Sequence, residues 1–138
     1  MSNTSSTHAE SPGRLAGRRI VITGAASGIG KATARRFMSE AATVILLDQN
    51  GGGLQSTLGE GRGAVFTVDV TDETAIQTVI DVAADKFGGI DGVINAAGIM
   101  STGLLLDVPV ATWRKTIEVN LTGTFLVARA CVPYLKRA

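Results

Sequence analysis

Residues 23–30 read TGAASGIG, and the glycines at 24, 28 and 30 define this stretch. The run RIVIT, which ends at Thr23, is β-branched and apolar, as in a buried strand, and a stretch with helical spacing of apolar residues follows. Glycine at such a junction allows a left-handed turn and a close backbone approach. The first-turn N–H groups of the helix then face outward. There they favour an anion such as a pyrophosphate, and Ser27 can add a hydroxyl donor.

A carboxylate follows the next apolar run. Asp48 comes directly after TVILL (residues 43–47), eighteen residues beyond Gly30. At the end of a strand it can accept hydrogen bonds from a ribose diol and would repel a 2′-phosphate, which favours NAD over NADP. Singly, the glycines could form a plain tight turn and Asp48 could be a solvated turn residue. Together they favour a dinucleotide site.

The rest of the chain alternates strands and helices, which predicts an α/β fold with a doubly wound parallel sheet in the order 3-2-1-4. Thr71 is the expected helix cap, with Asp72 and Glu73 in an acidic first turn, and Pro133 is expected to kink the last helix or loosen its last turn. The predicted strands are 19–23, 43–47, 64–68 and 92–96, and the predicted helices are 31–40, a short or frayed one near 54–58, one from 71 to 87, and one from about 110 almost to the end.

Composition narrows the function classes. The formal charge is +1, from 13 basic and 12 acidic residues. The chain therefore lacks the excess of positive charge that favours binding to nucleic acid or to an anionic membrane. No stretch holds the 18 or so apolar residues of a membrane span. Cys131 is the only cysteine, so we expect a small core residue, no disulfide and no metal site. Residues 1–14, with His8, are expected to form a disordered polar tail on a cytoplasmic protein whose single domain covers 15–138.

Taken together, these motifs resemble the short-chain dehydrogenase/reductase family. The resemblance runs from about Leu15 to the last residue, in family order and spacing. It implies a Rossmann-type fold and identifies the chain as the NAD-binding half of a longer enzyme, lacking strands 5 to 7. The motifs that carry it are TGAASGIG, Asp48, the pair Asp69 and Val70, NAAG at 95–98, and Asn120 within VNLTG.

The resemblance also implies roles for the cofactor residues. For Asp69, which the resemblance places at the adenine, the alternative is a strand-end residue that helps to cap the next helix. The family pattern N-N-A-G has lost its second asparagine at Ala96, and Ala41 stands where relatives often carry a helix-capping glycine. The implied contacts are Gly24, Ser27, Gly28, Ile29 and Gly30 with the pyrophosphate, Asp48 with the adenosine ribose, Asp69 and Val70 with the adenine, and Asn95 and Gly98 near the nicotinamide ribose.

For catalysis the resemblance implies that Asn120 bends the last helix and anchors a water of the proton relay. The alternative is a boundary asparagine bonded to a neighbouring loop. The family's catalytic serine and Y-x-x-x-K pair are absent, because Ala138 stands four places after Tyr134, the only tyrosine. We therefore expect this chain alone to be inactive. Trp113 is expected to anchor helix packing.

The expected activity is an NAD(H)-dependent interconversion of a secondary alcohol and a ketone, with a small-molecule substrate and a homo-oligomeric full-length form. A rival interpretation is a catalytically inactive nucleotide-binding or interaction module, and a third is a fragment that folds poorly. The last strand should present an open edge and the last helix an exposed apolar face, which favours partner pairing or aggregation.

Overall fold

In a computed structural model, which describes residues 12–138, four parallel strands form one sheet in the predicted order β3-β2-β1-β4. The register pairs Ile22 of β1 with Leu46 of β2 and with Ile94 of β4, so the carboxyl ends of the strands lie at one edge. The strands are β1 (Arg19–Thr23), β2 (Thr43–Asp48), β3 (Gly63–Thr67) and β4 (Gly92–Ile94).

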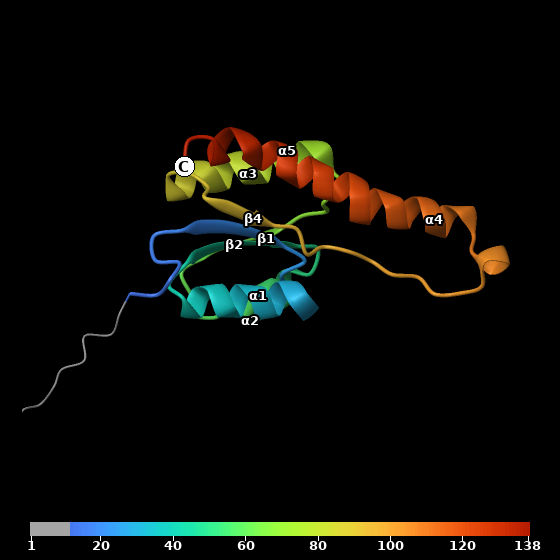
Figure 1. The fold of residues 1–138 in the computed structure, drawn as a ribbon, viewed down its shortest axis with the longest axis horizontal. Helices are drawn as coiled ribbons and strands as arrows, with labels where there is room; N and C mark the ends of the chain where they lie inside the picture. Colours follow the sequence, from blue (N-terminus) through green and yellow to red (C-terminus); the bar gives the residue numbers. More distant parts are fainter. Residues whose placement is uncertain (1–11) are drawn as a thin grey trace, which may run out of the picture.

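Helices cover both faces of the sheet (Figure 1). On one face, α1 (Gly28–Ser39) and α2 (Gly51–Leu58) enclose a core that includes Ile22 and Leu46. On the other face, α3 (Glu73–Phe87) and α5 (Thr124–Leu135) enclose a core that includes Val21, Ile45 and the buried Cys131. Alternate residues of β1 therefore point into different cores. Burial raises the pKa of the Cys131 thiol to about 12.

Three helix starts differ from the predictions, and the first is that α1 begins at Gly28 rather than at Lys31. Asp72, not Thr71, caps α3, since its carboxylate accepts the Ala75 N–H at 3.0 Å. The Thr71 hydroxyl is engaged elsewhere, because it donates to Asp69 at 2.7 Å. Helix α2 begins at Gly51 rather than near Leu54, since the Asn50 side chain accepts the Gly53 N–H at 3.0 Å. A side-chain cap thus offsets the low helix propensity of three glycines.

The last helical stretch consists of three segments, which are α4 (Val110–Ile117), a π-helical segment η2 (Glu118–Gly123), and α5. The π segment contains Asn120, where the resemblance implied a bend, and α5 continues past Pro133 to Leu135. Gly123 closes the segment against the core, because a Cβ there would lie 2.6 Å from Val70 Cγ2. A π-turn inserts one residue into a helix and so rotates the faces on its two sides relative to each other.

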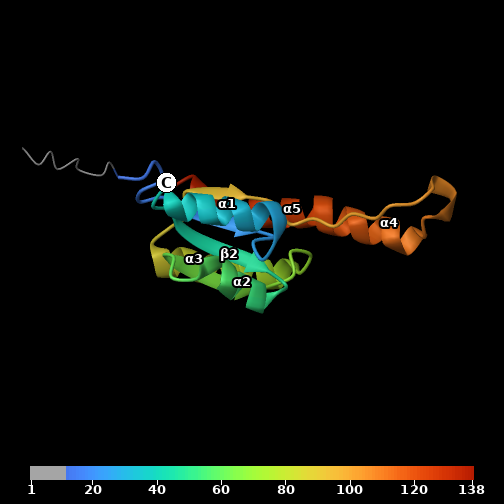
Figure 2. The same cartoon turned by 90° about the horizontal axis from the view of Figure 1, so that it is seen from below.

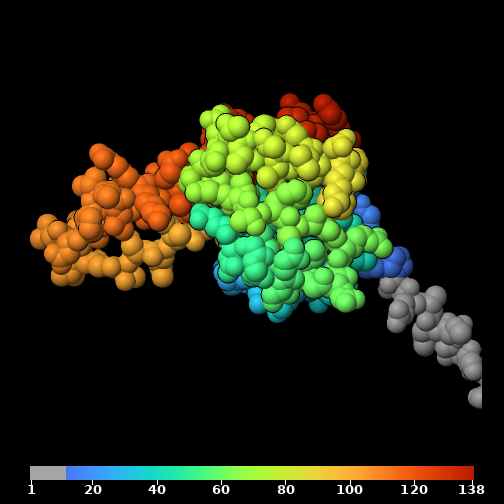
Figure 3. Space-filling model, turned by 180° about the vertical axis from the view of Figure 1, so that it is seen from behind, coloured from blue at the N-terminus to red at the C-terminus, as the bar shows by residue number. Residues whose placement is uncertain are grey.

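Helix α4 and the loop before it, which holds the short η1 (Leu105–Asp107), stand away from the rest of the molecule (Figures 2 and 3). Trp113 is 62% exposed, so its expected role as a packing anchor within the described chain is wrong. The helical face continues with Leu121 and Phe125, both exposed, as expected for this helix. Among residues 12–138, no helix combines the length and hydropathy of a membrane span.

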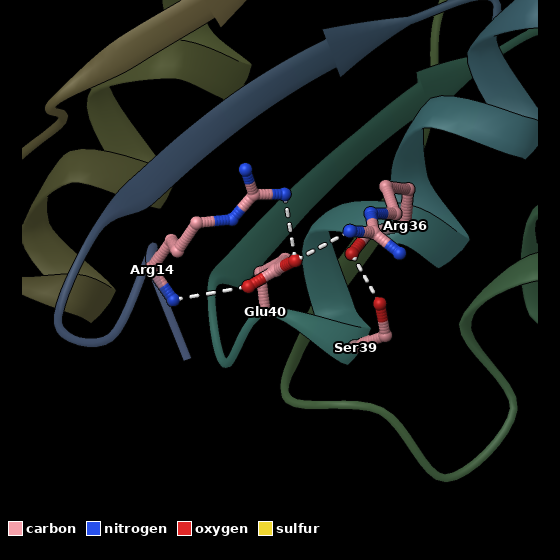
Figure 4. A network of polar contacts seen from close by, with 4 residues as sticks. All are labelled: Arg14, Arg36, Ser39 and Glu40. Carbon is pink, nitrogen blue, oxygen red and sulfur yellow. Dashed lines mark hydrogen bonds and ion pairs between the residues drawn. The ribbon is translucent and has the colours of Figure 1, made fainter. Parts of the chain in front are cut away.

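The described chain begins with a polar contact to the end of α1. Residues 1–11 of the predicted tail, with His8, lie outside the described residues, whereas Arg14 binds Glu40 through its backbone N–H (3.1 Å) and its guanidinium (2.8 Å). Arg36 donates to the same carboxylate at 2.7 Å (Figure 4). The hydrogen bonds from Arg14 lower the pKa of Glu40 from 4.5 to about 2.

This carboxylate should make stability depend on pH. Because the folded-state pKa of Glu40 is depressed, its contribution is fully present above pH 4.5 and is lost as the pH falls from 4.5 towards 2. We expect Glu40→Gln to reduce the slope of unfolding free energy against pH in that window. Urea titrations from pH 2 to 6 measure it. Glu60→Gln, at an exposed carboxylate that has no ion pair among residues 12–138, is the control, and equal slopes in both variants would contradict the assignment.

Ala41, directly after this carboxylate, has φ of 67°, the left-handed conformation expected at this position. Removing its Cβ relieves the backbone, so Ala41→Gly should raise the unfolding free energy by roughly 0.5–1 kcal/mol, after the greater unfolded-state entropy of glycine is subtracted. Ala32→Gly, the same change at an exposed site inside α1, should instead lower it by about 1 kcal/mol. Chemical denaturation of both variants tests the opposite signs.

Candidate functional site

A cavity of about 510 Å³ lies at the edge of the sheet where the strands end. Three of the predicted cofactor residues, Gly30, Asp69 and Asn95, do not line it. The other predicted cofactor residues do line it, namely Gly24, Ser27, Gly28, Ile29, Asp48, Val70 and Gly98. Sequence reasoning therefore grouped residues from four separate segments that the fold brings to one cavity.

Glycine is suited to each of the three positions of the turn for a different structural reason. Gly24 has φ of 64°, and a Cβ there would lie 2.7 Å from the Ala96 carbonyl oxygen. Gly30 sits against the turn itself, since its Cβ would lie 2.2 Å from the Gly24 carbonyl oxygen. Gly28 has φ of 53° and open space within 4 Å of its Cβ position. Gly24 and Gly30 thus allow close packing, whereas Gly28 leaves room on the cavity side.

The start of α1 is suited to an anion. Ser27 is the N-cap in an extended conformation, and its side chain makes no cap hydrogen bond to the helix. Helix geometry leaves the first-turn N–H groups without acceptors inside the helix. Ile29, in this turn, is 79% exposed on the cavity wall. The donors and the Ser27 hydroxyl are therefore available to a ligand phosphate.

Asp48 is held in place from both sides. Its Oδ2 accepts the Ala26 N–H and its Oδ1 accepts the Asn50 N–H, each at 3.0 Å. These bonds fix the carboxylate between the glycine turn and α2. Since each carboxylate oxygen has two lone pairs, both can still accept a hydroxyl from a vicinal diol.

The two residues expected to contact the adenine, Asp69 and Val70, differ in their position relative to the cavity. Val70 is buried and lines the cavity, whereas Asp69 is exposed and accepts the Thr71 N–H at 2.9 Å. Asp69 thus stabilises the turn before α3, close to the alternative role weighed for it, although the cap itself is Asp72. Asn95 is exposed just beyond β4 and does not line this cavity.

Thr23 joins the glycine turn to the segment after β4. It is fully buried, and its Oγ1 accepts the N–H groups of Ala96 (3.1 Å) and Ala97 (3.0 Å). Sequence reasoning placed Thr23 at the end of the strand and in the glycine motif, without a role for its hydroxyl. The signal was a hydroxyl at the end of a buried strand, because buried polar groups need partners.

Asn120 clamps the loop that follows Gly98. Its Oδ1 accepts the Ile99 N–H and its Nδ2 donates to the Ile99 carbonyl, both at 2.8 Å. The side-chain amide thus pairs with the Ile99 backbone as a neighbouring strand would. This is the contact expected of a boundary asparagine bonded to a neighbouring loop, the alternative given above. Asn120 does not itself line the cavity, and its catalytic role stays a prediction.

Other lining residues were missed as site residues. Lys115 and Val119 project from one face of the last helical stretch, four positions apart, and Ile99 faces them from the loop. The available signal was topological, since a helix after β4 can cross the carboxyl edge of the sheet. The full set of missed lining residues is Gln49, Val68, Ala96, Ala97, Ile99, Lys115 and Val119.

A second cavity, of about 270 Å³, is lined by Arg19, Asp81 and Tyr134 among others, and by none of the predicted site residues. The Tyr134 hydroxyl donates to Asp81 at 2.5 Å, and this hydrogen bond raises the pKa of Tyr134. Tyr134 therefore links α5 to α3 and lies outside the first cavity.

Residues 18–138 match the short chain dehydrogenase family, and the chain belongs to this family. The strand order and the similarity to solved dehydrogenase structures confirm the Rossmann-type α/β fold. The chain is therefore related to oxidoreductases.

Among curated relatives, a 3-oxoacyl-[acyl-carrier-protein] reductase of Thermotoga maritima is 42% identical over 127 residues, covering 88% of this chain and 52% of the relative. A D-threitol dehydrogenase of Mycolicibacterium smegmatis is 38% identical over 122 residues, covering 85% of this chain and 47% of the relative. The chain thus spans about half the length of these relatives.

Solved structures of dehydrogenases agree with this family assignment. A short chain dehydrogenase from Mycobacterium paratuberculosis bound to NAD superposes with a TM-score of 0.86 at 27% identity, over 91% of this chain and 53% of that one. A carveol dehydrogenase from Mycobacterium avium in complex with NAD gives a TM-score of 0.84 at 28% identity, over 89% and 51% of the two chains.

The glycine geometry predicts a graded response to alanine. Gly28→Ala forces a left-handed alanine into open space, which should cost about 1 kcal/mol of unfolding free energy. Gly24→Ala adds a backbone clash with Ala96, so we expect about 2 kcal/mol or more. Denaturant unfolding of both variants measures the difference. Equal losses would show that the turn tolerates a Cβ facing β4.

Proposed function

We propose that this chain provides the NAD(H)-binding half of an oxidoreductase that interconverts a secondary alcohol and a ketone. The observation that carries the proposal is one cavity that combines the start of α1 with the oriented carboxylate of Asp48. The cofactor, when bound, supplies the hydride acceptor or donor. The chain's residues bind and orient it.

The parts of the cavity suit the parts of a dinucleotide. The first-turn N–H groups of α1 and the Ser27 hydroxyl would hold the diphosphate, with Gly28 leaving room for it. Asp48 would accept hydrogen bonds from the adenosine ribose, and Val70 would pack against the adenine. Gly98 would lie near the nicotinamide ribose.

The proposed preference for NAD over NADP rests on charge. A 2′-phosphate near Asp48 would bring a dianion against a carboxylate, with the uncharged Ser27 and Gln49 beside it. Two structurally similar dehydrogenases were solved with NAD, which supports the same choice. The finer cofactor assignment is therefore NAD.

The chemical step is proposed to need residues other than these. In the family a serine and a Y-x-x-x-K pair move the proton while the lysine lowers the tyrosine pKa. The Y-x-x-x-K pair does not occur in this sequence, so the chain alone should turn over no substrate. Asn120 would contribute by fixing the loop after Gly98.

The substrate class is proposed as a secondary alcohol such as a polyol, sugar or hydroxy acid. An NAD preference favours the direction of oxidation, and D-threitol dehydrogenase and meso-2,3-butanediol dehydrogenase are among the relatives.

The exposed apolar face at Trp113, Leu121 and Phe125 supports a homo-oligomer. The location is proposed to be cytoplasmic.

Binding of NADH by the 138-residue chain tests the proposal. We expect NADH fluorescence to report saturable binding and NADPH to bind more weakly. Asp48→Asn keeps the shape but removes the charge, so NADH should bind roughly tenfold more weakly, as for loss of a charge-assisted hydrogen bond. The preference for NADH over NADPH should shrink in the same variant.

Circular dichroism of both proteins confirms that the fold is intact, since Asp48 also holds the Ala26 and Asn50 N–H groups. Asp107→Asn, a carboxylate in η1 outside the cavity lining, is the matched control. A folded chain without saturable NADH binding would exclude the cofactor-binding function and favour an interaction module.

A further inference from the structure

The cavity contains one basic side chain that the assigned contacts do not use. Only two of its lining side chains carry a charge, Asp48 and Lys115. Asp48 follows β2, whereas Lys115 comes from the last turn of α4. The two charges therefore reach the cavity from different sides of the carboxyl edge.

Lys115 is not neutralised by the protein around it. Within residues 12–138, no carboxylate oxygen lies within 4.0 Å of its ammonium group, whereas Arg14, Arg19, Arg36 and Arg129 each have such a partner. The neighbouring Arg114 does not line the cavity. Position 115 thus presents a charge to the cavity and position 114 does not.

The backbone that presents Lys115 is fixed to the same edge of the sheet. Val119, one turn later on the same helical face, lines the cavity as well. Asn120 then binds the Ile99 backbone through two hydrogen bonds of 2.8 Å. The base of the lysine is therefore held, while its four-carbon stem leaves the ammonium free to meet a ligand charge.

We propose that Lys115 binds the diphosphate of the dinucleotide, opposite the start of α1. This inference rests on the proposed function. The N–H groups of α1 supply only a partial positive charge, equivalent to about half an elementary charge at a helix terminus. A diphosphate carries more negative charge than that. Lys115 is the lining residue that can complement it, and the carboxylate of Asp48 is already held by two N–H groups.

The test compares ligands that differ in charge. The unsubstituted chain, Lys115→Gln, Lys115→Arg and the matched control Arg114→Gln are titrated with NADH, NADPH, ADP-ribose and uncharged adenosine. Lys115→Gln should weaken the binding of NADH and of ADP-ribose about two- to fivefold, the range for an exposed ion pair, and should leave the binding of adenosine unchanged. Lys115→Arg should restore binding, and Arg114→Gln should match the unsubstituted chain. The salt dependence of NADH affinity should flatten only in Lys115→Gln.

Three results would overturn the inference. Equal NADH affinity in Lys115→Gln and the unsubstituted chain would make Lys115 a solvated surface residue. An equal loss for adenosine would assign it to packing rather than to charge. A loss for NADPH without a loss for NADH would place it at the 2′-phosphate. If the unsubstituted chain binds no NADH, both this inference and the proposed function fail, whereas the first two results leave the proposed function standing.

Discussion

The contact between the glycine turn and the segment after β4 sets the geometry on which the site depends. The Thr23 Oγ1 receives two N–H groups from that segment, and Gly24 brings its backbone under the Ala96 carbonyl, where no Cβ would fit. This contact aligns the ends of β1 and β4. It also brings the start of α1 close to the turn, because a Cβ at Gly30 would lie 2.2 Å from the Gly24 carbonyl oxygen.

Three further side chains extend this edge in both directions. Asp48 and the buried Thr57 tie α2 to the turn, the former through the Ala26 N–H and the latter through the Ala25 carbonyl at 2.8 Å. On the other side, Asn120 ties η2 to Ile99. Each tie uses a polar side chain on a backbone group. The walls of the cavity are therefore positioned by hydrogen bonds between elements distant in sequence.

Sequence patterns predicted the strands, their order and most of the cavity, because these follow from local rules. β-branched runs and the left-handed conformation of Ala41 depend on a few neighbouring residues. The cap of α3 was misplaced by one residue, since Thr71 and Asp72 are both good caps and only the turn at Asp69 decides between them. Lys115 was missed because its place depends on how the helix after β4 runs past the carboxyl edge of the sheet.

The exposure of Trp113 has a related cause. Helical periodicity shows that a helix has an apolar face but not what covers that face, and here α4 stands clear of the sheet while Trp113 remains 62% exposed. The π segment adds to this, since it changes the rotation between α4 and α5 at Asn120, which spacing alone does not reveal. The cavity side of the same stretch is nevertheless fixed. Three hydrogen-bonding side chains, Thr23, Asp48 and Asn120, hold the walls of the cavity, and none of them belongs to the exposed apolar face.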